Sequence, residues 1–188
     1  MRKLIIQEFV SVDGFVADRN KTTAFFDSNP LIDADVNQEL LKFIHTLDTI
    51  VLGRNTYEMF VDFWPNTSNE EQIVADDLNR LPKFVFSKSL QEVHWGTWDN
   101  AILVSSDAID YVKELKADHG KDIVVWGSIS LTQSLLRAGL VDQIRLFICP
   151  IAIGQGYHLF PDEFDLFSLH LEQSISYKNG VVQLVYTI

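Results

Sequence analysis

The sequence predicts a single α/β domain whose central sheet is mixed, mostly parallel, and closed by a C-terminal antiparallel hairpin. Three observations support this prediction. Short apolar runs rich in β-branched and aromatic residues recur along the chain, segments with helical spacing separate them, and the last segment alternates apolar with polar residues. Of the 188 residues, 47% are hydrophobic, enough for a sizeable core. We therefore expect residues 1–188 to fold as one domain.

The expected buried strands are apolar runs that are too short for helices. Val, Ile, Leu and Phe dominate them, which is typical of strands covered on both faces. These runs occupy residues 4–10, 49–52, 84–86, 101–104, 123–126 and 144–149.

Helices are expected between these strands, because apolar side chains there recur every three or four residues. Ser106 and Asp107 suit a helix start, and Gly139 is expected to end a helix of residues 129–138. Because helices then connect successive strands, most strand pairs are expected to be parallel. The clearest spacings are Val36-Leu40-Phe43-Leu47, Ile109-Val112-Leu115 and Leu131-Leu135-Leu136.

The C-terminal segment has the pattern of a hairpin. Leu169, Leu171, Ile175 and Tyr177 alternate with polar residues, and a second apolar run fills residues 181–188. Asn179-Gly180 between the two runs is a strong turn signal. We expect this hairpin to close one edge of the sheet, and its apolar side chains suggest that the protein forms a homodimer.

The charge balance restricts the partners. The chain carries 15 basic and 26 acidic residues, a formal net charge of −11. Nucleic acids and anionic membrane surfaces attract clustered Lys and Arg, so both are excluded as general partners. Any phosphate-bearing ligand must therefore be bound by a few local cations or backbone N–H groups within this acidic surface.

Localisation and metal binding follow from the cysteine and histidine content. Cys149 is the single cysteine, so no internal disulfide forms, and the sequence has no long apolar run of the kind that spans a membrane. We expect a cytoplasmic protein that does not bind a membrane. The five histidines are scattered without metal-ligand spacing, so no metal site is predicted.

Three predicted strand ends carry chemistry that suits a phosphate. A glycine permits a tight turn into a helix, whose free N–H groups attract anions. In α/β sheets, ligands gather at the carboxyl ends of strands. Taken singly, these glycines are equally compatible with plain turns and these cations with solvated charges. The three strand ends are Gly53-Arg54, Ser87-Lys88 and Gly127-Ser128-Ile129-Ser130.

Six segments carry a family resemblance: residues 11–15, 52–58, 83–88, 125–128, 139–144 and 150–156. In this order and spacing, they resemble the dihydrofolate reductase superfamily and, within it, the reductase domain at the C-terminus of riboflavin-biosynthesis (RibD-like) proteins. The H-x-E and P-C-x-x-C motifs of the zinc deaminase domain that accompanies this reductase in bifunctional members are absent. The resemblance therefore implies a stand-alone member with a three-layer α/β/α, dihydrofolate-reductase-like fold.

The resemblance implies that NADPH is the cofactor. Gly53, Arg54 and Thr56 then hold its phosphates, with Arg54 near the 2′-phosphate, and Ser87 and Lys88 complete that recognition. The turn at Gly127 and Ser128 and the helix start at Ile129 and Ser130 cradle the pyrophosphate. Relatives usually have a second glycine where this chain has Ser128.

The implied reaction is hydride transfer to a C=N or C=O bond of a small heterocycle of pterin, flavin-precursor or pyrimidine type. Folate-reducing members carry a carboxylate on the first helix, near Asn37 here. Asp33, Asp35 and Glu39 lie nearby and could supply this carboxylate only if the register differs. The alternative is that each is a helix cap or a solvated helix residue.

Asp13, beside the implied nicotinamide site, is the acidic residue that we select as the catalytic group, with turn formation as the alternative. Trp64 is the expected substrate contact. A nucleotide-binding module of the same fold without catalytic activity is the alternative function.

Overall fold

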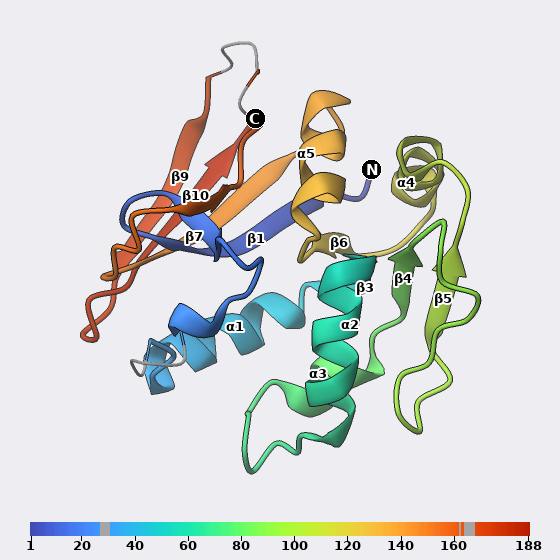
Figure 1. Cartoon of the computed structure of the whole chain (residues 1–188), viewed down its shortest axis with the longest axis horizontal. Helices are drawn as coiled ribbons and strands as arrows, with labels where there is room; N and C mark the ends of the chain where they lie inside the picture. The colour runs from blue at the N-terminus through green and yellow to red at the C-terminus, as the bar shows by residue number, and fades with distance from the viewer. Residues whose placement is uncertain (27–30, 162, 164–167) are drawn as a thin grey trace.

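The computed structural model describes residues 1–26, 31–161, 163 and 168–188. Across these residues an eight-stranded sheet runs in the order β5-β4-β3-β6-β1-β7-β10-β9 (Figure 1). The strands are β1 (Leu4–Ser11), β3 (Leu47–Gly53), β4 (Lys83–Phe86), β5 (Ala101–Val104), β6 (Asp122–Val125), β7 (Gln143–Cys149), β9 (His170–Ser176) and β10 (Val182–Thr187).

The strand directions agree with the prediction of a mostly parallel sheet. β1 is central and runs parallel to both neighbours, with Ile6 opposite Val125 on β6 and Ile144 on β7. β10 is antiparallel to β7 and to β9. The C-terminal hairpin therefore closes one edge of the sheet, as predicted.

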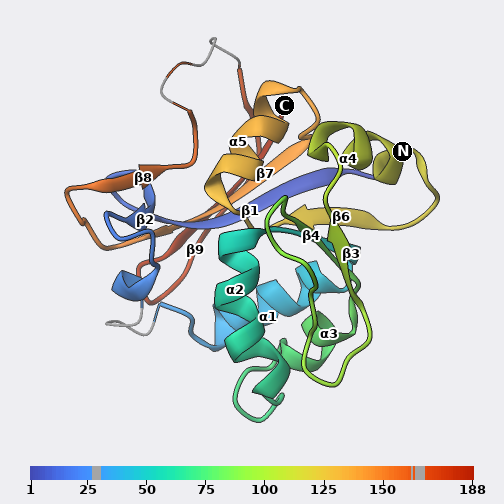
Figure 2. The same cartoon turned by 45° about the vertical axis from the view of Figure 1, so that its right-hand side comes forward.

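Helices cover both faces of the sheet (Figures 1 and 2). Ile50 and Val51 are adjacent on β3, so their side chains point to opposite faces, and they belong to two separate cores. α1 (Ala34–Ile44), α2 (Arg54–Phe63) and α3 (Ala75–Arg80) pack into the Ile50 core, whereas α4 (Ala108–Ala117) and α5 (Ile129–Arg137) pack into the Val51 core. This arrangement is the predicted three-layer α/β/α fold.

The predicted helix ends agree closely with the structure. The carboxylate of Asp107 caps α4 by accepting hydrogen bonds from the N–H groups of Ile109 and Asp110, at 2.9 and 3.2 Å. After α5, Gly139 has a φ of +64°, the left-handed conformation that ends helices.

Several elements lie outside the sequence prediction. β2 (Phe15–Asp18) and β8 (Gly156–His158) form a small antiparallel sheet beside the main one, and α3 is a short helix. The loop residue Trp95 is fully buried, and its indole N–H donates to the side-chain oxygen of Asn79 at 2.7 Å. These elements are short or depend on contacts with distant residues, which no local pattern encodes.

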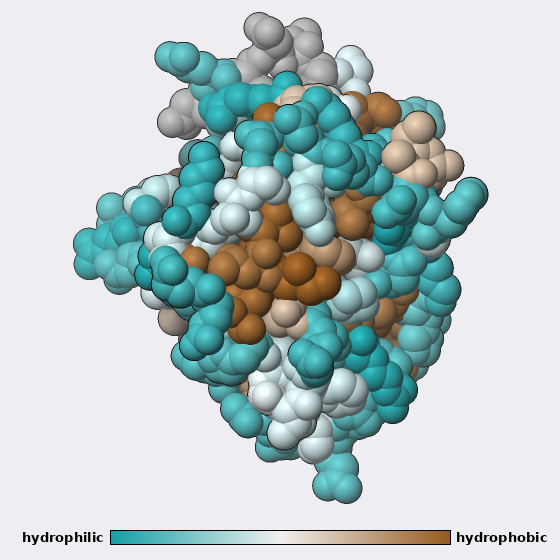
Figure 3. Space-filling view, turned by 90° about the vertical axis from the view of Figure 1, so that its right-hand side faces the viewer, coloured by the Kyte–Doolittle hydropathy of each residue, from teal (hydrophilic) through white to brown (hydrophobic). Residues whose placement is uncertain are grey.

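Both edge strands expose an apolar side chain, Ile102 on β5 and Leu171 on β9, with 44% and 47% of their surface accessible. Figure 3 shows the side of the molecule that carries β5, where a patch of apolar side chains interrupts a polar surface. The homodimer stays a prediction. Among the described residues, no helix has the length and apolar character needed to cross a membrane.

Candidate functional site

The site begins where β6 ends. β6 stops at Val125, whereas β1 continues to Ser11 alongside β7. From Gln7 onward, β1 therefore has no strand neighbour on the β6 side. This gap lies at the carboxyl ends of parallel strands, where α/β sheets place their ligands.

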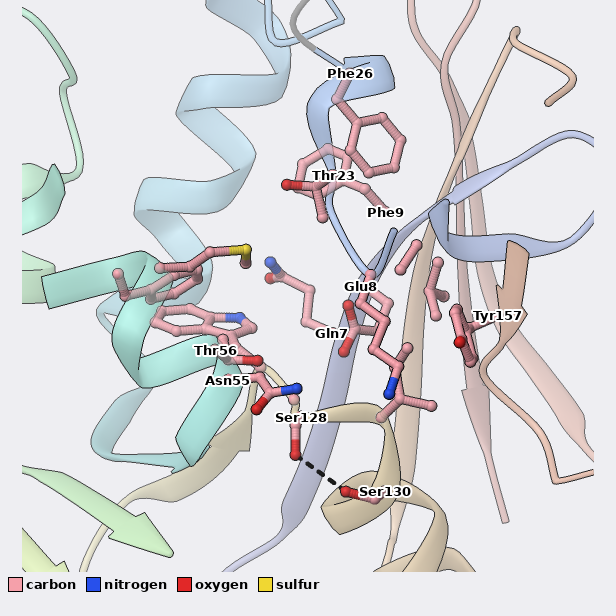
Figure 4. Close-up of a pocket in the computed structure, with 18 of the residues that line it drawn as sticks. Gln7, Glu8, Phe9, Thr23, Phe26, Asn55, Thr56, Ser128, Ser130 and Tyr157 are labelled. Carbon is pink, nitrogen blue, oxygen red and sulfur yellow. Dashed lines mark hydrogen bonds between the residues drawn. The ribbon is translucent and has the colours of Figure 1, made fainter. Parts of the chain in front are cut away.

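A pocket of about 920 Å³ fills this gap. Its walls come from β1, α1, α2, the turn after β6, the start of α5, and the β2–β8 flap (Figure 4). Three consecutive β1 residues, Gln7, Glu8 and Phe9, line it. Aromatic side chains on the α2 side and phosphate-compatible groups on the α5 side make it a single cleft with two chemically different ends.

Three polar atoms of the pocket lining are buried and have no hydrogen-bond partner among the described residues. They are the side-chain oxygens of Gln7 and Asn37 and the indole nitrogen of Trp126. An unpaired buried polar atom costs on the order of 1–3 kcal/mol, so such atoms in a pocket are available to hydrogen-bond a ligand. Together they offer one indole donor and two carboxamides.

Glu8 is the acidic residue that β1 contributes to the pocket. Its side chain is partly buried and points toward the pocket centre in Figure 4. Burial raises the pKa of Glu8 to about 8. At neutral pH, most of these carboxyl groups therefore hold a proton.

The predicted glycine turns meet each other. The N–H of Gly53 donates to the carbonyl oxygen of Gly127 at 2.8 Å, which joins the starts of α2 and α5. Gly127 has a φ of +100°, and a Cβ there would lie 2.6 Å from Thr56 Oγ1. A Cβ on Gly53 would collide with the Ser128 side chain. Both positions therefore require glycine for this approach.

The start of α5 faces the pocket. Ser128 is its N-cap residue, and no side chain caps the helix, so the first N–H groups remain available. Ser128, Ile129 and Ser130 all line the pocket, and the two serine hydroxyl oxygens lie 3.3 Å apart (Figure 4). These uncapped N–H groups and hydroxyls are suited to bind an anion.

Arg54, Ser87 and Lys88 lie outside the pocket lining. Arg54 donates to Glu58 Oε1 at 2.7 Å and to Ser89 Oγ at 2.9 Å, and Ser87 Oγ lies 3.3 Å from the same Ser89 oxygen. The structure thus groups Arg54 with Ser87 through Ser89, a residue that the sequence analysis missed. Lys88 is exposed and has no ion pair among the described residues.

Trp64 lines the pocket, as a substrate contact would, and its ring packs edge-on against Phe60 at 6.2 Å. Thr56 and Gly127 also line it. The carboxylates near Asn37 do not: Asp33 caps α1 by accepting from the N–H of Val36 at 2.9 Å, and Glu39 pairs with Arg145, also at 2.9 Å.

Asp13 also lies outside the pocket lining. Its carboxylate accepts hydrogen bonds from the N–H groups of Gly154 and Ile153, at 2.7 and 3.1 Å. The Ser11 hydroxyl and the Gly154 N–H lower the pKa of Asp13 below its ordinary value. An ionised group that joins two loops is a clamp, so this geometry does not support the predicted role of Asp13 as a proton donor.

Other reactive residues are not grouped into a second centre. Within the described ranges, no three His, Cys, Asp or Glu side chains come together as metal ligands. Cys149 is buried, and burial raises the pKa of its thiol to about 12, so it stays protonated.

The fold is that of the dihydrofolate-reductase-like α/β domains, with a cleft at the carboxyl ends of its strands. The sequence matches the RibD C-terminal domain over residues 2–183, and the chain belongs to that family. It is 30% identical over 189 residues to the uncharacterized protein YyaP of Bacillus subtilis (strain 168), covering 98% of this chain and 94% of YyaP.

Two solved structures share this fold. A proposed riboflavin biosynthesis protein from Shewanella sp. PV-4 has a TM-score of 0.78 and 24% identity, covering 98% of each chain. A pyrimidine reductase-like protein from Corynebacterium diphtheriae has a TM-score of 0.69 and 20% identity, covering 99% of this chain and 91% of that one. At these identities the likeness establishes the fold alone.

Proposed function

We propose that this protein is an NADPH-dependent reductase that transfers a hydride to a C=N or C=O bond of a small planar heterocycle of pterin, flavin-precursor or pyrimidine type. The observation that carries the proposal is the single cleft with two ends, an anion-binding helix start and a set of unpaired polar atoms. The RibD C-terminal domain family includes reductases, which supports the same activity.

The residues at the α5 end fit a dinucleotide. Gly53 and Gly127 let the starts of α2 and α5 pack closely against each other, and the uncapped N–H groups after Ser128 suit a pyrophosphate. We assign the 2′-phosphate to Arg54, a cation outside the pocket lining that Glu58 and Ser89 hold by hydrogen bonds. When bound, NADPH supplies the hydride, and these residues orient it.

The residues at the α2 end fit a neutral heterocycle. The carboxamides of Gln7 and Asn37 can each donate and accept, as the amide edge of a pterin or pyrimidine requires. Trp126 offers an N–H donor, and Trp64 and Phe60 offer aromatic surface for a flat ring. These groups would align the ring and exclude water from the reacting bond.

Titration of NADPH and NADH, followed by ligand fluorescence, tests this proposal. We expect micromolar binding with a preference for NADPH. Arg54→Ala should weaken NADPH binding about tenfold, the size of one lost charge-assisted hydrogen bond, and narrow the preference over NADH. Lys113→Ala removes an exposed cation on α4 and is the matched control. If neither NADPH nor NADH binds, the proposal is contradicted.

A nucleotide-binding module without catalysis is the second candidate, because Asn37 replaces the carboxylate expected on the first helix. The two candidates differ in one measurement. A reductase oxidises NADPH when a dihydropterin, an aminopyrimidine or a flavin precursor is added, whereas a binding module binds NADPH and leaves it unchanged.

A further inference from the structure

Glu8 occupies an unusual position on β1. It lies two residues after Ile6, the last β1 residue paired with β6, so β1 has no strand neighbour on the β6 side at Glu8. Its side chain lines the pocket beside Gln7 and extends toward the centre (Figure 4). Among the described residues, none forms a hydrogen bond or an ion pair with the Glu8 carboxyl group. A carboxyl that faces a ligand pocket without a partner is available to the ligand.

Charged groups on the packed elements are engaged elsewhere or lie outside the pocket. On β7, Arg145 pairs with Glu39 at 2.9 Å. On β2, the Asp18 carboxylate accepts hydrogen bonds from the N–H groups of Asn20 and Thr22, at 2.8 and 2.9 Å. Neither Arg145 nor Asp18 lines the pocket. No cation from these strands therefore neutralises Glu8.

The titratable groups that line the pocket also leave Glu8 unpaired. The Lys21 ammonium lies 5.3 Å from the centre of the Tyr157 ring, and His158 Nδ1 lies 3.0 Å from the carbonyl oxygen of Gly14. Burial without a neutralising charge is what raises the pKa of Glu8. The lining groups of this kind are Lys21, Arg137, Tyr157, His158 and Glu163.

We propose that Glu8 donates the proton that the reduction consumes. The inference rests on the proposed function and adds the residue that completes its chemistry. The Glu8 O–H bond breaks, and its proton goes to the nitrogen or oxygen of the substrate double bond. The hydride that forms the new C–H bond, with its two electrons, comes from NADPH, which leaves as NADP⁺. Glu8 is left as a carboxylate and regains a proton from water.

This role has a consequence that requires no substrate. The nicotinamide ring is neutral in NADPH and cationic in NADP⁺. A Glu8 carboxylate in the same pocket attracts the cationic ring, whereas a protonated Glu8 does not. The affinity ratio of the two cofactor forms should therefore change with pH around the titration of Glu8. Protonation of the 2′-phosphate affects both forms alike and cancels in that ratio.

The test measures the dissociation constants of NADPH and NADP⁺ from pH 6.5 to pH 9.5. In the wild type, the affinity for NADP⁺ relative to that for NADPH should rise about tenfold from pH 6.5 to pH 9.5, as expected for one partly screened pair of opposite charges. In Glu8→Gln the ratio should be flat. Glu114→Gln removes an exposed carboxylate on α4 and should behave as the wild type.

A second readout follows the proton itself. At pH 8, NADP⁺ binding to the wild type should release a fraction of a proton into weak buffer, detected with an indicator dye, and Glu8→Gln should release none. Glu8→Asp keeps a titrating carboxyl and should retain both effects, so the test survives if Glu8→Gln fails to fold.

The outcomes separate the two proposals. Binding of both cofactor forms with a pH-independent ratio overturns the role of Glu8 and leaves the reductase proposal standing. A ratio that changes equally in the wild type and in Glu8→Gln also overturns it, because another group then titrates. Failure of both forms to bind overturns the reductase proposal and the role of Glu8 together.

Discussion

Lys83 allows a quantitative test of the packing beneath the sheet, because it is fully buried at the start of β4. Its ammonium donates to the carbonyl oxygen of Asn79 at 2.6 Å and lies 4.5 Å from the centre of the Trp95 ring. Among the described residues it forms no ion pair. Burial lowers the pKa of Lys83 from 10.5 to about 7. The charged lysine therefore destabilises the fold.

The sign and size of the pH effect follow from this shift. Between pH 7 and pH 10.5 the unfolded chain binds more protons at this site than the folded one, so the free energy of unfolding rises with pH. At about 1.4 kcal/mol per pKa unit, the site contributes a rise of about 2.5 kcal/mol between pH 6 and pH 9. The cation–π contact with Trp95 favours the charged form and makes this an upper value.

Urea unfolding of the wild type and Lys83→Met at pH 6 and pH 9 measures the effect. The difference in unfolding free energy, wild type minus variant, should rise by up to about 2.5 kcal/mol from pH 6 to pH 9. The contributions of Glu8 and of every other titrating group to the unfolding free energy are the same in both proteins, so they cancel in this difference. Lys113→Met, at an exposed position, should show no change. A rise below about 0.5 kcal/mol refutes the reasoning, because burial then leaves the charged lysine undisturbed.

Two further predictions concern the turns of the site. Gly127→Ala should weaken NADPH binding at least tenfold, because the added methyl group meets Thr56. Gly139→Ala is the control: its φ is also positive, but no atom lies within 4 Å of the added methyl group, so it should lower stability without changing NADPH affinity. Equal NADPH affinities of the two variants contradict this prediction. Asp13→Asn should unfold at a lower temperature than the wild type at pH 7. Because the folded pKa of Asp13 lies below its ordinary value of 3.8, that difference should shrink as the pH falls from 3.8 through the lower, folded pKa. A difference that does not shrink at all as the pH is lowered from 7 into this acidic range contradicts the clamp.

The sequence predicts the main sheet well because its inner strands β1, β3 and β6 are largely buried on both faces and its helices have one apolar face. The cap Asp107 and the stop Gly139 are local signals, so the ends of α4 and α5 follow from a few residues. β2 and β8 escape prediction because their pairing joins Phe15 to His158, a contact set by the whole chain.

The site is predicted in part for the same reason. Gly53 and Gly127 directly follow predicted strands, so local pattern and sheet topology together bring these two turns into contact, and Thr56 and Gly127 line one end of the cleft. The unpaired atoms of Gln7 and Trp126 could not be inferred, because they depend on β6 ending before β1 does. Gln7 sits within an apolar run and looks like a strand residue with no special role.

Glu8 in β1 and Asp13 just after β1 show why residue type alone cannot assign an acid. Asp13 accepts a hydrogen bond from the N–H of Gly154, which is 141 residues away in the chain, and its pKa is lowered. Glu8 has no such donor among the described residues, and burial raises its pKa to about 8. Both are acidic residues near one strand end, yet hydrogen bonding keeps one ionised and desolvation keeps the other protonated. Under the proposed reductase activity, Glu8 is the carboxyl group that both lines the pocket and keeps its proton, whereas Asp13 lies outside the pocket and is ionised.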